Sequence, residues 1–146
     1  MIRRAGGAAA AAAILATACG GSSPAAPGIS TGPVTTTFNG TARSSGPNSC
    51  GGDTLALDAG SGEVSVTLVQ AAPSTPLLLQ MCAPTATNHV NDCSINRTTI
   101  QVGQMVRGTV VGGRSQVLAL NPGDCGNGQP PQFPSIAYTV SVVYPR

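Results

Sequence analysis

The stretch Glu63-Val64-Ser65-Val66-Thr67-Leu68 alternates polar and apolar residues without a break. Successive side chains of a β-strand point to opposite faces, so this stretch predicts a strand with its valines and leucine on the core side. Glu63 falls on the opposite side, toward solvent. No helical repeat of apolar positions persists anywhere after residue 34, so we expect β-strands in the rest of the domain as well.

Seven further stretches are rich in Thr, Val and Leu and are bounded by Gly, Pro and Asn, as strands are. They are residues 34–41, 54–58, 77–82, 93–102, 105–111, 115–120 and 136–144. The residues expected on the inward faces are Val34, Thr36, Phe38, Leu55, Leu57, Ile136, Tyr138, Val140, Val142 and Tyr144. Eight short strands joined by such turns predict an all-β sandwich or barrel.

The first 18 residues predict an export signal, helical in form, with a basic head at Arg3 and Arg4 and small residues before Cys19. The uncharged part is shorter than the roughly 20 residues of a membrane-spanning helix. Leu15-Ala16-Thr17-Ala18-Cys19 resembles a bacterial lipobox, although that family prefers Leu where this chain has Ala16. The resemblance implies a diacylglycerol lipid on Cys19, which would anchor the protein in a membrane. Ordinary cleavage that leaves a free Cys19 is the alternative.

The same segment predicts the location of the protein. Gly20 replaces the Asp that retains such lipoproteins at the inner membrane, so we expect a lipid-anchored protein of the bacterial cell envelope, at the outer membrane and facing the periplasm or the surface. Residues 19–33 are mostly Gly, Ser, Pro, Ala and Thr, which predicts a disordered tether of roughly 20 Å. The expected domains are the signal peptide 1–18, the tether 19–33 and a β-sandwich 34–146.

Beyond residue 18, five arginines balance five acids, so the domain has no basic surface for nucleic acid. Four cysteines remain once Cys19 carries lipid, and in an exported chain they imply two disulfides with three possible connectivities. In a jelly roll the eight strands pair as nested couples, first with eighth, second with seventh, third with sixth and fourth with fifth. That topology brings Cys50 to Cys125 and Cys82 to Cys93. We therefore expect an eight-stranded, jelly-roll-like antiparallel β-sandwich with these two bridges.

Four segments carry a family resemblance: Phe38-Asn39-Gly40-Thr41, Thr54-Leu55-Ala56-Leu57, Gly62 to Leu68, and Tyr138-Thr139-Val140-Ser141-Val142. Residues 34–144 resemble the bacterial pre-peptidase C-terminal type of β-sandwich. The resemblance implies a jelly-roll-like domain of secreted or lipid-anchored proteins. Val117-Leu118-Ala119-Leu120 departs from it, since many relatives have an aromatic residue there. An immunoglobulin-like sandwich is the alternative fold, without the Cys-Trp-Cys pattern of true immunoglobulin domains.

Residues that could perform catalysis are few. His89 is the one histidine, and Asp92 lies near it in the loop between Cys82 and Cys93, but no Gly-x-Ser-x-Gly elbow accompanies them. We therefore expect no enzyme and no cofactor. A small envelope hydrolase using His89 is one alternative, and an accessory subunit of an envelope complex is another.

Oxygen-bearing side chains flank one predicted bridge: Asn48 and Asp53 near Cys50, and Asn121, Asp124 and Asn127 near Cys125. Calcium favours such ligands, whereas Asn and Asp are equally ordinary turn residues, which is the competing interpretation. The expected role is binding, adhesion or structure. The loops Thr85–Asp92, with His89 and Asp92, and Gly126–Pro134, with Phe133, are the expected contact surfaces for a protein or glycan ligand.

Overall fold

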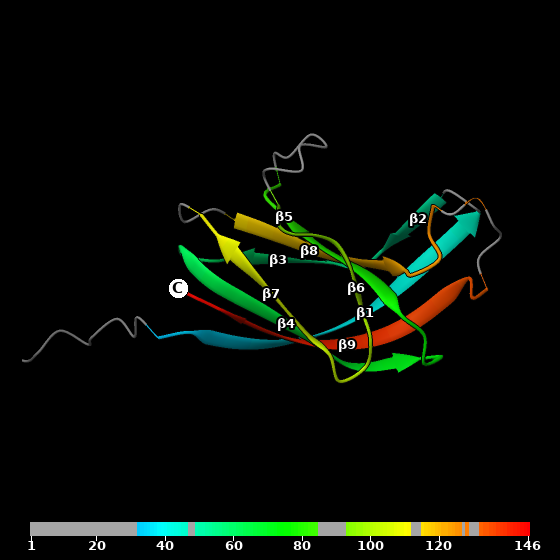
Figure 1. Ribbon diagram of the computed structural model, residues 1–146, viewed down its shortest axis with the longest axis horizontal. Coiled ribbons are helices and arrows are strands. Elements are labelled where there is room, and N and C mark those ends of the chain that lie inside the picture. Colours follow the sequence, from blue (N-terminus) through cyan, green and yellow to red (C-terminus); the bar gives the residue numbers. More distant parts are fainter. Residues whose placement is uncertain (1–31, 47–48, 85–92, 112–114, 127, 129–131) are drawn as a thin grey trace, which may run out of the picture.

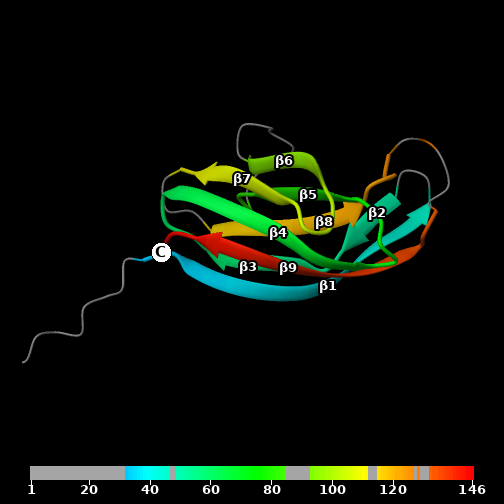
Figure 2. The same cartoon turned by 60° about the horizontal axis from the view of Figure 1, so that its bottom comes forward.

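The computed structural model describes residues 32–46, 49–84, 93–111, 115–126, 128 and 132–146. These residues form nine strands: β1 (Val34–Gly46), β2 (Ser49–Gly52), β3 (Thr54–Asp58), β4 (Gly62–Ala72), β5 (Leu77–Cys82), β6 (Cys93–Ile100), β7 (Met105–Val110), β8 (Ser115–Pro122) and β9 (Ser135–Tyr144). Two antiparallel sheets lie face to face (Figures 1 and 2). The predicted all-β sandwich is confirmed. In the described part of the chain, no helix has the length and apolar character to cross a membrane.

The strand order follows the nested pairing of a jelly roll. One sheet has the order β2-β1-β9-β4-β7 and the other the order β3-β8-β5-β6. All four predicted couples are present, as β1 with β9, β3 with β8, β4 with β7 and β5 with β6. Each sheet sets two of these couples side by side, so residues from both ends of the chain meet in one sheet.

The alternation in β4 determines which of its residues enter the core. Val64, Val66 and Leu68 are 0% exposed, while Glu63 faces solvent and pairs with Arg107 of β7. Leu, Val and Ile fill most of the space between the sheets, together with Met81, Tyr138 and a few alanines. Each fully buried Val or Leu stabilises the fold by about 1.5–3 kcal/mol, so a core with few aromatic rings suffices.

The strand bounds differ from the sequence prediction in several places. β1 continues to Gly46 and pairs there with β2, a ninth strand that the sequence did not predict. Ser49-Cys50-Gly51-Gly52 carries no alternation and two glycines, so its extended form comes from pairing with β1 rather than from its own residues. β4 also continues to Ala72, and β6 ends at Ile100 rather than 102.

Both bridges that the nested pairing predicts are formed. Cys50 is bonded to Cys125, with the two Cα atoms 6.1 Å apart, and Cys82 is bonded to Cys93, directly opposite it in the pair of β5 and β6. The first bridge ties the added strand β2 to the segment after β8. The predicted signal, the lipid site Cys19 and most of the tether lie outside the described residues.

Candidate functional site

The outer face of the five-stranded sheet presents neutral polar side chains in register. Thr37 of β1 lies opposite Ser141 of β9, which lies opposite Thr67 of β4. One step along the strands, Asn39 lies opposite Thr139, which lies opposite Gln70. We call this surface the polar face, made of Thr35, Thr37, Asn39, Ser65, Thr67, Gln70, Thr139 and Ser141, all exposed or half-buried. In the row of Thr35 and Ser65, the β9 residue opposite both is Val143.

The polar face follows from the same alternation that fills the core. Because side chains alternate between the two faces of a strand, a strand that buries its valines must direct the residues between them outward. In β1, β4 and β9 those residues are mostly Thr, Ser, Asn and Gln. Neighbouring strands lie about 4.8 Å apart, so directly opposite side chains form rows of closely spaced hydroxyl and amide groups.

A β-bulge in β4 places Gln70 in the polar face. The register against β9 shifts between Leu68 and Gln70, so Gln70 rather than Val69 lies opposite Thr139. Val69 is the extra residue and is 52% exposed. Without the bulge, Gln70 would lie opposite Tyr138 and would point into the core. A bulge thus sets the direction of a side chain on this face.

Beside the bulge the polar face is hollowed. The depression measures about 190 Å³ and is lined by Asn39, Gly40, Gln70, Ala72, Ala137, Tyr138 and Thr139. The Thr139 hydroxyl donates a hydrogen bond of 2.7 Å to Asn39 Oδ1. That bond leaves the Asn39 amide hydrogens and the Gln70 amide as neutral donors and acceptors around small alanine side chains.

Two larger hollows lie elsewhere on the surface. One, of about 450 Å³, is lined by Asp58, Ala59, Gly60, Tyr144 and Arg146. The other, of about 470 Å³, lies at the hairpin of β1 and β2 and adjoins residues 47–48, which are not described. The hollow at the hairpin has serine hydroxyls from two strands. In the depression beside the bulge, hydroxyl and amide side chains of three paired strands meet, from Asn39, Thr139 and Gln70, so we take it as the candidate site.

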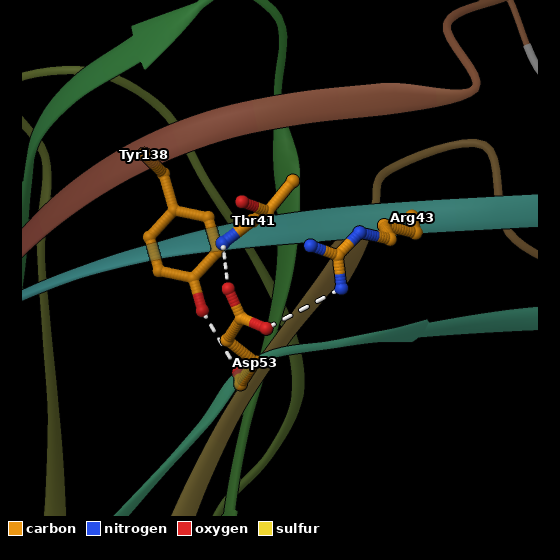
Figure 3. Close-up of polar contacts among 4 residues, drawn as sticks. All are labelled: Thr41, Arg43, Asp53 and Tyr138. Atoms are coloured by element: carbon orange, nitrogen blue, oxygen red, sulfur yellow. Dashed lines mark hydrogen bonds and ion pairs between the residues drawn. The ribbon is translucent and has the colours of Figure 1, made fainter.

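Asp53, one of the predicted oxygen ligands, is engaged in hydrogen bonds within the fold (Figure 3). Its carboxylate accepts hydrogen bonds from the Thr41 main-chain nitrogen at 2.9 Å and from Arg43 Nη1 at 3.4 Å. Its main-chain nitrogen donates to the Thr41 oxygen at 2.9 Å, and its carbonyl accepts a bond of 3.0 Å from the Tyr138 hydroxyl. Asp53 therefore joins the start of β3 to β1 and β9 of the other sheet.

The hydroxyl of Tyr138 is the one described group whose pKa departs clearly from its usual value. Burial, and secondly the negative charge of Asp53, raise the pKa of Tyr138 from 10.0 to about 12. The ring is 3% exposed and lies 6.1 Å from the ring of Phe38. Tyr138 is therefore a neutral hydrogen-bond donor at physiological pH.

The other predicted ligands do not form a described metal site. One oxygen of Asp124 accepts a hydrogen bond of 2.8 Å from the Gln132 main-chain nitrogen, and Asn121 lies in β8 opposite Leu78. Asn48 and Asn127 lie outside the described residues. Within the described ranges, no three His, Cys, Asp or Glu side chains gather as metal ligands do.

The predicted contact residues are placed in part. His89 and Asp92 lie in the segment 85–92, which the structure does not describe. Phe133 is half-buried against the core, which gives it a packing role, and its part in binding stays a prediction. The chain matches no protein-family model, no curated protein and no solved structure.

Proposed function

We propose that this chain is a lipid-anchored, non-catalytic binding module of the bacterial cell envelope, and that its polar face binds an uncharged glycan. The observation that carries the proposal is the register of hydroxyl and amide side chains across β1, β9 and β4. Sugar hydroxyls donate and accept hydrogen bonds, as the Thr, Ser, Asn and Gln side chains of this face do.

The electrostatics favour a neutral ligand. At the border of the polar face, Arg107 of β7 lies opposite Ser65, and its charge is paired with that of Glu63. The five arginines and five acids after residue 18 also cancel, so the domain has no net charge that would attract an anionic or cationic polymer.

The size of the depression favours a polymer over a small molecule. Pockets that enclose a small ligand measure about 300–1,000 Å³ and cover most of its surface. The depression beside the bulge is smaller, about 190 Å³, and opens onto a broad face. A ligand that gains affinity here must extend over several rows of side chains, as a glycan chain does.

The location is supported by covalent chemistry. Disulfides persist in oxidising compartments, and this domain has two. The lipobox-like stretch before Cys19 supplies the export signal and the attachment point. More than one acyl chain on Cys19 would make membrane attachment stable.

Glycan binding is tested by affinity electrophoresis through gels containing soluble neutral polysaccharides of different linkages. The unmodified domain should be retarded by at least one of them. The double variant Asn39→Ala/Gln70→Ala should bind about 30-fold more weakly, since two neutral hydrogen bonds contribute about 1 kcal/mol each. Thr54→Ala, an exposed change in the other sheet, should leave retardation unchanged. An unmodified domain that no neutral polysaccharide retards would contradict glycan binding.

Lipid anchoring is tested separately by membrane fractionation and intact mass. The native protein should sediment with membranes, dissolve in detergent and carry the mass of acyl chains on residues 19–146. Cys19→Ser should abolish the added mass. A soluble protein with an unmodified Cys19 would show ordinary signal cleavage instead, and would leave the glycan experiment unaffected.

A further inference from the structure

The strand order leaves one long stretch of sheet edge open. In the described part of the chain, β2 and β7 end one sheet, and β3 and β6 end the other. β2 pairs only with Ala42–Gly46, the second half of β1. The first half of β1, residues 34–41, therefore forms a sheet edge of its own, visible in Figure 1 where β2 covers only one end of β1. We call residues 34–41 the open edge.

The other edges carry features that discourage pairing with a further strand. β7 carries the charged Arg107. It is also crossed closely by β6, since Gly108 of β7 lies against the main-chain oxygen of Ser94 in β6. β6 is irregular around Arg97, which has a φ of 39°, and its register against β5 shifts there. β2 has four residues and β3 has five, the last being the exposed Asp58.

The open edge has none of these features. Its sequence, Val34 to Thr41, holds eight residues without charge or proline, and its register against β9 runs without a shift. Long, regular and uncharged edges are those that pair with further strands.

The main-chain groups of the open edge point away from β9 at alternate residues. The Thr41 nitrogen and oxygen both bond to Asp53, which lies on the side away from β9. In an antiparallel strand, successive residues direct their main-chain N–H and C=O groups to alternate sides. Thr35, Thr37 and Asn39 therefore direct both groups away from β9, as Thr41 does. Asp53 thus closes the edge at Thr41, and three residues before it present a donor and an acceptor each.

An apolar side chain lies beneath this edge. Phe38 is only half-buried against the core, and so is Leu55 of β3, the edge strand of the other sheet. A strand added to the open edge would cover part of the Phe38 ring, and burial of apolar surface favours association.

We propose that two copies of this chain pair through the open edge, β1 antiparallel to β1, to join their five-stranded sheets. The edge is complementary to itself. With Thr37 of each copy on the two-fold axis, Thr35 lies opposite Asn39, and the outward groups exchange about six main-chain hydrogen bonds. No charge on either strand opposes this pairing. The two polar faces then lie side by side on one continuous sheet.

The pairing is tested by sedimentation of residues 20–146, which hold every described strand and both disulfides. The mass of the sedimenting species should double as the protein concentration is raised from micromolar to millimolar. Thr37→Lys alone and Thr37→Glu alone should each remain a single copy, because like charges meet at the axis. Their equimolar mixture should recover the doubled mass, which shows that neither variant is misfolded. Thr37→Val, which keeps the main-chain donor, should pair like the unmodified chain.

Two results would overturn the proposal. One is an unmodified chain that stays a single copy throughout the concentration range. The other is a doubled mass that Thr37→Lys leaves unchanged, since that copy would pair through another surface. Neither result bears on glycan binding, which is measured by retardation in the gel.

Discussion

At the scale of single residues, Asp53 and Tyr138 fasten the two sheets at one point. The Tyr138 hydroxyl crosses from β9 to the carbonyl at the start of β3, and the Asp53 carboxylate returns to the main chain of β1. Gly40 makes room for this contact, since a Cβ there would lie 2.5 Å from the Tyr138 hydroxyl oxygen. An aspartate that the sequence suggests as a ligand is thus engaged in holding the fold.

The raised pKa of Tyr138 predicts a loss of stability in alkali. The unfolded chain releases this proton near pH 10, whereas the folded protein holds it up to about pH 12. The free energy of unfolding should therefore be unaffected by this group below pH 10 and should fall by about 1.4 kcal/mol per pH unit between 10 and 12. Urea denaturation at a series of pH values measures the fall.

Tyr138→Phe should remove this pH dependence and cost about 1–3 kcal/mol at neutral pH, because the Asp53 carbonyl loses its buried donor. Tyr144→Phe is the matched control, since it leaves Tyr138 in place. An equally steep alkaline fall in Tyr138→Phe would assign the effect to another group.

At the scale of elements, β6 and β7 close one side of the sandwich by crossing tightly. Gly108 of β7 lies directly under the Ser94 main chain of β6. The Ser94 hydroxyl also donates a 3.0 Å hydrogen bond to Gln116, which is buried in β8. The crossing brings the edges of the two sheets together where no strand pairing joins them.

Gly108→Ala should destabilise the domain by about 1–3 kcal/mol, the usual cost of overpacking. Its methyl group would collide with main-chain atoms of β6, which cannot rotate away as a flexible side chain does. Gly51→Ala should change stability by less than about 0.5 kcal/mol, because a Cβ there meets nothing within 4 Å. Equal stability of the two variants in urea denaturation would contradict the close crossing.

At the scale of the whole molecule, the two disulfides constrain loops of very different length. Cys50 and Cys125 are separated by 75 positions, and Cys82 and Cys93 by 11. The longer loop spans most of the nested strand couples, so its bridge restricts the unfolded chain more. The shorter bridge fastens only the ends of β5 and β6.

Removing the bridges one at a time should reveal this difference. By loop-closure entropy the double variant Cys50→Ser/Cys125→Ser should lose about 4.5 kcal/mol, and Cys82→Ser/Cys93→Ser about 2.8 kcal/mol. Thermal and urea denaturation of both variants beside the unmodified domain measure the losses. A larger loss from the shorter loop would mean that local strain, rather than loop closure, governs stability.

Most of the fold could be predicted from the sequence because strand alternation is a local property. Val64, Val66 and Leu68 reveal their common face within six residues, and the order of four cysteines matches the nested couples. β2 could not be predicted, because its residues have no alternation and become extended only beside β1.

The candidate site was less predictable than the fold, because it depends, as β2 does, on which strands lie side by side. The sequence by itself determined that Thr37, Thr67 and Ser141 point outward, since the period of two is fixed by each strand's own backbone. Only the tertiary structure decided that they form a row, and that a bulge turns Gln70 to the same face. The register between strands is the one that buries their apolar side chains in the core, and this core is built from strands that are distant in the sequence.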